Sequence, residues 1–344
     1  MNTSPRPRRG WLRSAALLIG LASALSAAPA KDADLLGRWA LTIPGGAAGW
    51  LELEKKNGWY DGSILWGGGS VLPVANVVIA DGVATVTRVR EVQRKDASGK
   101  VIRTQQVTET ITARAEGDTL KLTRVAPRGN SEGFDRAEFT GKRIPALPSA
   151  PNLSKVKFGE PISLLNGRDL SGWSLKEKDM PSAWKIKNGA LVNEPAPQVD
   201  GQPKVRYANL RTDREFEDFN LKLEVNIPQG SNSGIYLRGI YEVQVFDSYQ
   251  KPLDSHHMGA IYSRIVPAVA AEKPPGEWQT LDITLVDRHA TVILNGKTII
   301  DNAPLEGVTG GAMWSDQFRP GPLYLQGDHG AVSYRNIVIR PVVK

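Results

Sequence analysis

The segment from residue 232 to residue 247 holds the side chains that are best suited to chemistry. Successive side chains of a strand point to opposite faces, so the polar residues of this segment gather on one face and its aliphatic residues on the other. The polar face carries Tyr236, Arg238, Glu242 and Gln244. A phenol, a guanidinium, a carboxylate and an amide are groups that can grip a polyhydroxylated ligand. The alternative interpretation is a solvated sheet face with chance polar residues.

Strands must position these side chains, because helical periodicity is nearly absent after residue 30. Short alternating runs separated by Gly, Asn, Asp and Pro are typical of an all-β protein. A proline-rich segment at residues 144–157 interrupts the pattern and indicates an extended linker. We therefore expect a small N-terminal β-barrel or sandwich at residues 31–143 and a larger jelly-roll sandwich at residues 158–344. Dipeptides that favour two-residue hairpin turns occur in both blocks: Asp81-Gly82, Asn188-Gly189 and Asn295-Gly296.

Residues 1–30 predict an export signal rather than part of the fold. A basic stretch containing Arg8 and Arg9 precedes a short apolar run, and Ala28-Pro29-Ala30 fits a cleavage site. The paired arginines resemble the twin-arginine export pattern, and ordinary Sec export is the alternative. The apolar run is too short for a convincing membrane span. We therefore expect a periplasmic or secreted protein.

Charge and composition exclude several classes of partner. The formal net charge is +7, and four of the positive charges lie in the first thirty residues. The rest of the chain carries about +3 with its basic residues scattered, so we expect no nucleic-acid partner. The chain has no cysteine, which excludes disulfides and thiolate metal sites. The sequence leaves the oligomeric state open.

Eight motifs carry a family resemblance, and they occur in order along the second block. They are LLNGRDLSGW (164–173), NSGIYLRG (232–239), YEVQVFDSY (241–249), GAIY (259–262), PPGEWQTLDI (274–283), LNG (294–296), LQGDHG (325–330) and YRNI (334–337). With them, the block resembles the domain-of-unknown-function 1080 family, also described as the 3-keto-disaccharide or 3-keto-glycoside hydrolase domain. The resemblance implies a concanavalin-like β-sandwich, export from the cytoplasm, and an oligosaccharide or glycoside as substrate. The N-terminal β-domain has no role that transfers from the family.

The chemistry that the resemblance implies begins with a sugar already oxidised at C3. The carbonyl acidifies the hydrogen on C2, so a base can remove it and the aglycone on C1 can leave by elimination. Addition of water to the resulting enone completes net hydrolysis. This route requires a general base, a donor for the developing enolate oxygen and an acid at the leaving oxygen. It requires no nicotinamide, and we expect no cofactor.

The polar face supplies the leading candidates for these roles. Glu242 is the candidate base, and a structural ion pair with Arg238 is its alternative role. Arg238 could instead polarise the keto oxygen, which suits a guanidinium. Gln244 and Gln326 are expected to bind hydroxyls, because each amide offers a donor and an acceptor. Tyr236 is expected to contact the substrate beside them.

Histidines and aromatic residues outside this face complete the expected site. His256 lies in a loop after the second strand and could shuttle a proton, and His329 is the second candidate; for both, an inert surface histidine is the alternative. Tyr262 and Trp278 are candidates for stacking on a sugar ring, with core packing as the alternative.

Two aspartates are the remaining candidates for substrate binding. Asp247 ends the second strand, and Asp328 stands next to His329. Many relatives lack Gly327, and this extra residue before Asp328 predicts a bulge that would redirect its carboxylate. Asp247, Asp328 and His329 could together bind a divalent cation, but their spacing is not diagnostic and we predict no metal.

Two function classes fit the fold and the residues. The first is an exported glycan-catabolic hydrolase that cleaves 3-keto-glycosides. The second is a non-catalytic carbohydrate-binding module that uses the same polar face. The enzyme requires a poised carboxylate or imidazole in addition to hydroxyl-binding groups. Glu242, with His256 expected nearby, favours the enzyme.

Overall fold

The computed structural model describes residues 1, 32–199, 201, 203 and 205–343 of the chain. The predicted export signal lies almost wholly within residues 2–31, outside the described residues. The regular secondary structure of the described part is nearly all strand, as the sequence predicts, with two short 3-10 helices: η1 (Asp32–Leu35) and η2 (Leu153–Lys155). No helix in these described ranges has the length and apolar character of a bilayer span.

Residues 37–143 form a nine-stranded antiparallel sheet in the order β4-β3-β2-β1-β9-β8-β7-β6-β5. The sheet curls so that β5 lies against β3, and it encloses a core that includes Leu41, Leu53 and Ile111. This is the small barrel-like domain that the alternating runs predict. Its strands are β1 (Gly37–Thr42), β2 (Ala48–Lys56), β3 (Trp59–Trp66), β4 (Leu72–Pro73), β5 (Asn76–Ala80), β6 (Val83–Lys95), β7 (Val101–Glu116), β8 (Thr119–Pro127) and β9 (Phe134–Arg143).

The second domain is a sandwich of two antiparallel sheets. The larger sheet has the order β12-β13-β22-β15-β18-β19-β20, with β10 paired to β22. Its strands are β10 (Ile162–Ser163), β12 (Trp184–Lys187), β13 (Ala190–Asn193), β15 (Phe219–Asn226), β18 (Trp278–Val286), β19 (His289–Leu294), β20 (Lys297–Pro304) and β22 (Val332–Pro341). The smaller sheet has the order β11-β14-β21-β16-β17 and contains β11 (Trp173–Leu175), β14 (Leu210–Phe216), β16 (Asn232–Leu237), β17 (Tyr241–Phe246) and β21 (Gly321–Leu325).

The two sheets of the sandwich share one apolar core. Leu221 and Ile283 of the larger sheet belong to the same buried cluster as Ile235 and Val243 of the smaller sheet. The alternation of apolar and polar residues along these strands places one face of each in this cluster. The predicted hairpin turns are also present. Asn295 and Gly296, for example, have φ of 49° and 79°, which is the left-handed backbone that a two-residue Asn-Gly turn requires.

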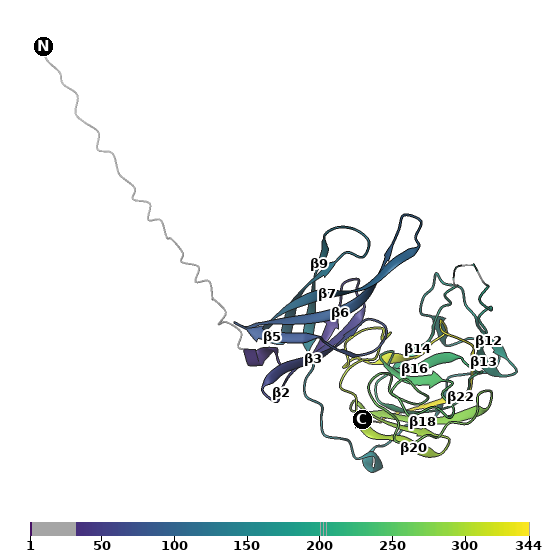
Figure 1. The fold of residues 1–344 in the computed structure, drawn as a ribbon. Helices are drawn as coiled ribbons and strands as arrows, with labels where there is room; N and C mark the ends of the chain where they lie inside the picture. The colour runs from purple at the N-terminus through teal and green to yellow at the C-terminus, as the bar shows by residue number, and fades with distance from the viewer. Residues whose placement is uncertain (2–31, 200, 202, 204, 344) are drawn as a thin grey trace.

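The N-terminal sheet packs directly on the sandwich (Figure 1). Strand β2 is buried on both faces: Leu51 points into the N-terminal core, whereas Trp50 and its cross-strand partner Leu65 belong to the core of the sandwich. Trp50 Nε1 donates to the backbone oxygen of Glu306 at 3.1 Å. The two domains therefore meet through apolar contacts as well as hydrogen bonds, and the N-terminal domain is close enough to contribute to sites on the sandwich.

Candidate active site

Strands β16 and β17 form the hairpin that carries the polar residues identified in the sequence. Tyr236 pairs with Glu242, and Gly234 pairs with Gln244. These positions share one face of the smaller sheet. The intervening residues, such as Ile235 and Val243, are fully buried in the sandwich core. The period of two in this segment therefore places Tyr236, Glu242 and Gln244 together, as the sequence predicts.

The hydroxyl of Tyr236 lies between two acceptors. Its oxygen is 2.9 Å from Glu242 Oε2 and 2.8 Å from the backbone oxygen of Gly310. A phenol has one hydrogen, and a carbonyl oxygen can only accept. Both contacts are hydrogen bonds at once only if Tyr236 donates to Gly310 and Glu242 carries a proton. The geometry therefore favours a neutral Glu242 in the resting protein.

The surroundings of Glu242 push its pKa in the same direction. Burial raises the pKa of this carboxyl from the ordinary 4.5 to about 8. Donation from the Tyr236 hydroxyl to the ionised carboxylate would lower it, and the negative charge of Asp328 raises it. The side chain is 3% exposed. Burial and the Glu242 charge also raise the pKa of the Tyr236 phenol well above 10, so it stays protonated. Glu242 is thus a stronger base, once ionised, than a solvated carboxylate.

Two residues that were not among the sequence candidates extend this cluster. The ring of Tyr324, on β21, stacks on the ring of Tyr236 with centroids 4.2 Å apart. The ammonium of Lys176 lies 5.4 Å from the centroid of the Tyr324 ring. Tyr324 stands two residues before Gln326, so the alternation that selected Gln326 also pointed to it. Lys176 directly follows β11, which has only three residues, so the alternation is too short to show which face its side chain takes.

Three amide oxygens on this face are buried without a hydrogen-bond partner. They belong to Asn232, Gln244 and Gln326. Gln326 continues the pairing of β21, because its backbone nitrogen donates to the oxygen of Gly234 at 2.9 Å. Buried acceptors are normally paired. Hydroxyl groups of a polyol could supply the donors that these oxygens lack.

Gly234 creates the space in which the Glu242 carboxyl lies. A Cβ at this position would clash with Glu242 Oε1 and would lie 2.9 Å from Cδ of the same side chain. Gly234 is not one of the glycines with a positive φ, so its backbone conformation does not require glycine. The requirement for glycine is therefore steric: the absence of a side chain admits the carboxyl over the strand.

Asp328 and His329 lie at the edge of this cluster. His329 Nδ1 is 2.7 Å from Asp328 Oδ1, and both residues line a cavity of about 660 Å³ together with Tyr207. Burial tends to raise the pKa of Asp328, but the hydrogen bond and charge of His329 outweigh it, and the pKa is below its ordinary value. Despite the extra Gly327, the Asp328 carboxylate is close enough to act on Glu242.

The structure corrects the expected position of Arg238. Strand β16 ends at Leu237, and Arg238 has a left-handed backbone with φ of 55°, so it does not continue the polar face. Its guanidinium donates to the backbone oxygens of Gln317 and Arg319, each at 2.6 Å. Arg238 therefore holds a loop in place, and no ion pair with Glu242 forms among the described residues.

Other expected residues lie apart from the Glu242 cluster. Trp278 is on β18 of the larger sheet, and the guanidinium of Arg335 covers its ring at 4.1 Å. Asp247 Oδ2 accepts from the backbone nitrogen of Gly230 at 2.8 Å, which is a turn-stabilising contact. Asp247 therefore does not join Asp328. Within the described ranges, no three acidic or histidine side chains are grouped as a metal site.

His256 belongs to a different arrangement from the one expected. Its Nε2 is 2.8 Å from Ser70 Oγ of the N-terminal domain, and its Nδ1 is 2.6 Å from Asp254 Oδ1. Tyr262 packs edge-on against the imidazole, with centroids 4.9 Å apart. A hydroxyl, an imidazole and a carboxylate in this order resemble a nucleophilic triad. However, the side chains of His256 and Asp254 are 41% and 52% exposed, and neither residue lines the cavity beside Asp328 and His329. We interpret the arrangement as a link between domains.

Comparison with known proteins identifies the family. The model of the 3-keto-alpha-glucoside-1,2-lyase-like domain matches residues 160–340, which is more than half of the chain. The chain therefore belongs to this family. A protein named 3-keto-disaccharide hydrolase, from Bacteroides thetaiotaomicron, is 25% identical over 184 residues, which cover 46% of this chain and 60% of that protein. The match thus spans less than two thirds of the length of that relative.

Solved structures also show similarity. A crystal structure from Parabacteroides distasonis, provisionally described as a glycosyl hydrolase, is 29% identical and covers 58% of this chain and 93% of that chain, with a TM-score of 0.42. The carbohydrate-binding module CBM66 from Bacillus subtilis is 13% identical and covers 48% of this chain and 93% of that chain, with a TM-score of 0.28.

Proposed function

We propose that this protein is a glycan-catabolic enzyme that cleaves 3-keto-glycosides, with Glu242 as the general base. Membership of the family and the name of the Bacteroides relative support the substrate class. The observation that carries the proposal is the Glu242 carboxyl itself: it is buried, its pKa is raised to about 8, and it lies on a face with three unpaired acceptor oxygens. A sugar-binding face without chemistry has no need of such a carboxyl.

The proposed reaction uses the acidity that the C3 carbonyl gives to the neighbouring carbon. The Glu242 carboxylate takes the hydrogen from C2, and the electron pair of that bond moves into an enolate with the C3 oxygen. The enolate then expels the aglycone oxygen from C1, which leaves an enone. Water adds to the enone, so the net result is hydrolysis. A base with a pKa near the working pH is well matched to the first step.

The neighbouring side chains could orient the substrate and supply the acid at the leaving oxygen. The oxygens of Asn232, Gln244 and Gln326 would accept hydrogen bonds from sugar hydroxyls and orient the ring. Asp328, whose lowered pKa keeps it anionic, holds Nδ1 of His329. The Nε2 atom of His329 would then protonate the departing oxygen. The cavity beside Asp328 and His329 provides the room for the aglycone.

Export is part of this proposal, and the basic and apolar character of residues 1–30 supports it. The proposed location is the periplasm or the medium, where glycans are encountered. No cofactor is needed for the elimination as written, because the substrate carries the oxidised carbon. The reaction would therefore follow a separate step that oxidises C3 of the sugar.

The test is incubation of the purified protein with a panel of 3-keto-glucosides and their unoxidised parents, followed by mass spectrometry of the products. We expect release of aglycone from the 3-keto compounds alone. Binding of both sets without release would favour the carbohydrate-binding module instead. Cleavage of the unoxidised parents would contradict the elimination route, since the C2 hydrogen is not acidic there.

A further inference from the structure

A groove between the two domains is lined by residues that the proposed chemistry does not use. Its volume is about 500 Å³. One wall is the N-terminal sheet, and the other is the loop that connects β20 to β21. The lining includes Thr42, Thr140 and Lys142 on the first wall and Trp314, Asp316 and Gln317 on the second.

Two buried donors in the groove loop have no hydrogen-bond partner. They are the indole Nε1 of Trp314 and the amide Nε2 of Gln317. Gln317 is 1% exposed, and its Oε1 already accepts from the hydroxyl of Tyr241 at 3.0 Å. The remaining amide group is therefore fixed as a donor. Unpaired buried donors are unfavourable unless a ligand pairs with them, so the groove calls for a ligand rich in acceptor oxygens.

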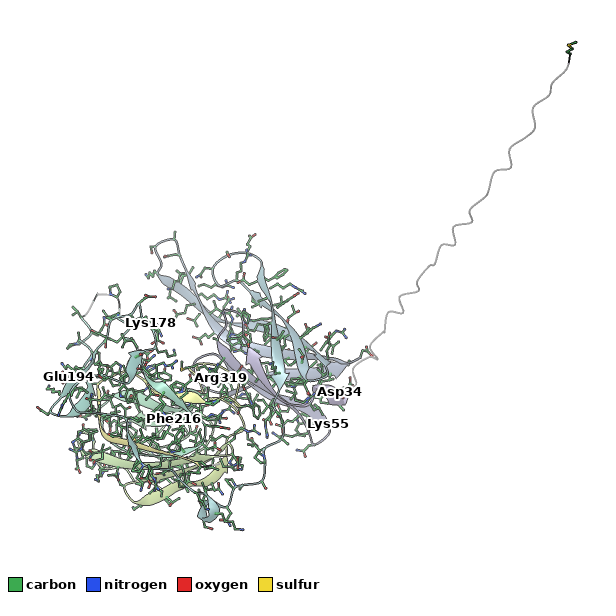
Figure 2. All side chains as sticks on the ribbon, turned by 180° about the vertical axis from the view of Figure 1, so that it is seen from behind. Asp34, Lys55, Lys178, Glu194, Phe216 and Arg319 are labelled. Atoms are coloured by element: carbon green, nitrogen blue, oxygen red, sulfur yellow. The ribbon has the colours of Figure 1, made fainter. Side chains whose placement is uncertain are left out.

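The loop that carries these donors is rigidly held. The guanidinium of Arg238 binds the backbone oxygens of Gln317 and Arg319, and the guanidinium of Arg319 lies 3.9 Å from the centroid of the Trp314 ring. Figure 2 shows Arg319 on the side of the sandwich that faces the N-terminal sheet. A donor pair that is ordered before the ligand arrives loses little conformational freedom on binding.

The groove is connected to the Glu242 cluster by the same loop. The backbone oxygen of Gly310 lies 2.8 Å from the hydroxyl of Tyr236, and the backbone nitrogen of Met313 donates to the oxygen of Gly239 at 2.9 Å. The chain from Gly310 to Gln317 can span at most roughly 25 Å when fully extended. One ligand chain could therefore reach both places, provided that it is an oligomer.

We propose that this groove is a second saccharide subsite, which binds a remote unit of the glycan through its acceptor oxygens while the Glu242 cluster binds the oxidised unit. The part concerning the oxidised unit rests on the proposed function, whereas binding in the groove does not. Ring and hydroxyl oxygens accept from the indole and amide N–H groups. An acidic sugar would add a charge-assisted contact with Lys142 at the rim.

The test is calorimetric titration of the full chain with unoxidised cellopentaose, as a neutral probe, and with pentagalacturonate, as an acidic probe. Trp314→Phe, which removes one donor, is expected to weaken binding about fivefold, the equivalent of one neutral hydrogen bond. Thr140→Arg fills the groove from an exposed position on β9 and is expected to remove measurable binding. Thr108→Arg, at an exposed position on β7 outside the groove, is the matched control and is expected to bind like the wild type.

Two results would overturn the subsite. One is that neither probe binds the wild type at millimolar concentration. The other is that Trp314→Phe and Thr140→Arg both bind like the wild type, which would place binding elsewhere. Turnover of a 3-keto-glucoside with a small aglycone is measured on the same preparation. Turnover without oligosaccharide binding contradicts the subsite alone, and binding without turnover contradicts the elimination alone.

Discussion

The hydroxyl of Tyr236 lies 2.9 Å from a carboxyl oxygen of Glu242 and 2.8 Å from the backbone oxygen of Gly310, to which it can donate its single hydrogen. This relationship fixes which proton state of Glu242 is compatible with the resting structure. A protonated Glu242 completes both hydrogen bonds, whereas an ionised Glu242 competes with Gly310 for the same hydrogen. In the resting protein, Glu242 is therefore protonated and must lose its proton before it can act as a base.

The first prediction concerns the dependence of turnover on pH. If Glu242 is the base, only its ionised form is active, so kcat/KM for a 3-keto-glucoside should rise with pH and level off above about 8. Initial rates between pH 6 and pH 9.5 are the measurement. A rate that instead falls as the pH passes about 8 would show that the protonated carboxyl is the active form, and Glu242 would then be the acid.

The second prediction is that Glu242→Gln loses turnover while keeping its fold. The amide has nearly the same shape but cannot accept the C2 hydrogen, and removal of a general base costs roughly 10²- to 10⁴-fold in rate. Glu194→Gln is the matched control, because Glu194 is a surface carboxylate paired with Lys185 and Lys187 (Figure 2). Circular dichroism checks the fold. Full activity in Glu242→Gln would assign the base elsewhere.

The third prediction concerns stability. The pKa of Glu242 is about 8 in the folded protein and near 4.5 when unfolded, so between these values the folded state holds the extra proton. Its contribution is fully present below pH 4.5 and is lost as the pH rises through 8, by up to about 5 kcal/mol. Urea unfolding at pH 5 and pH 8.5 should show a smaller difference in Glu242→Gln than in the wild type. Equal differences in the two proteins would refute the raised pKa.

The fourth prediction is that Gly234→Ala impairs turnover by displacing the Glu242 carboxyl. The added methyl group would occupy the space of Oε1, so the side chain must rotate away from the face. We expect a loss of at least about tenfold in kcat, since small displacements of a catalytic group are costly. Gly68→Ala is the control, because a Cβ there meets no atom within 4 Å. Wild-type kinetics in Gly234→Ala would mean that the carboxyl position is not critical.

The fifth prediction separates the Ser70–His256 contact from catalysis. Ser70→Ala removes a hydrogen bond of 2.8 Å between the domains, which is expected to lower the free energy of unfolding by about 1 kcal/mol. Turnover of a 3-keto-glucoside should remain at the wild-type level. A large loss of turnover with unchanged stability would instead bring Ser70 and His256 into the active site.

The parts of the site that lie within one hairpin could be predicted from the sequence. The alternation around Ile235 and Val243 fixes which side chains share a face with Glu242, because the period of a strand is two. Arg238 escaped this argument because the strand ends one residue earlier, and a left-handed residue turns the side chain away. The local sign of that change is Gly239, which also has a left-handed backbone and marks the hairpin turn between the two strands.

The contacts between segments could not be predicted in the same way. The loop of His256 reaches the polar face, as expected, because Gln244 Nε2 donates to the backbone oxygen of His256 at 3.1 Å. Its imidazole, however, contacts Ser70, almost two hundred positions earlier in the chain. Tyr324 reaches Tyr236 only because β21 pairs with β16, which is a crossover that alternation does not specify. Pairing between distant strands depends on the packing of whole sheets rather than on local pattern.

The insertion of Trp50 into the apolar interior of the other domain has a consequence for how the molecule behaves as a whole. Unfolding or removing either domain would expose apolar surface on the other. Heating should therefore produce one cooperative calorimetric peak for both halves. The N-terminal domain is thus expected to be a structural part of the whole molecule rather than a separable unit.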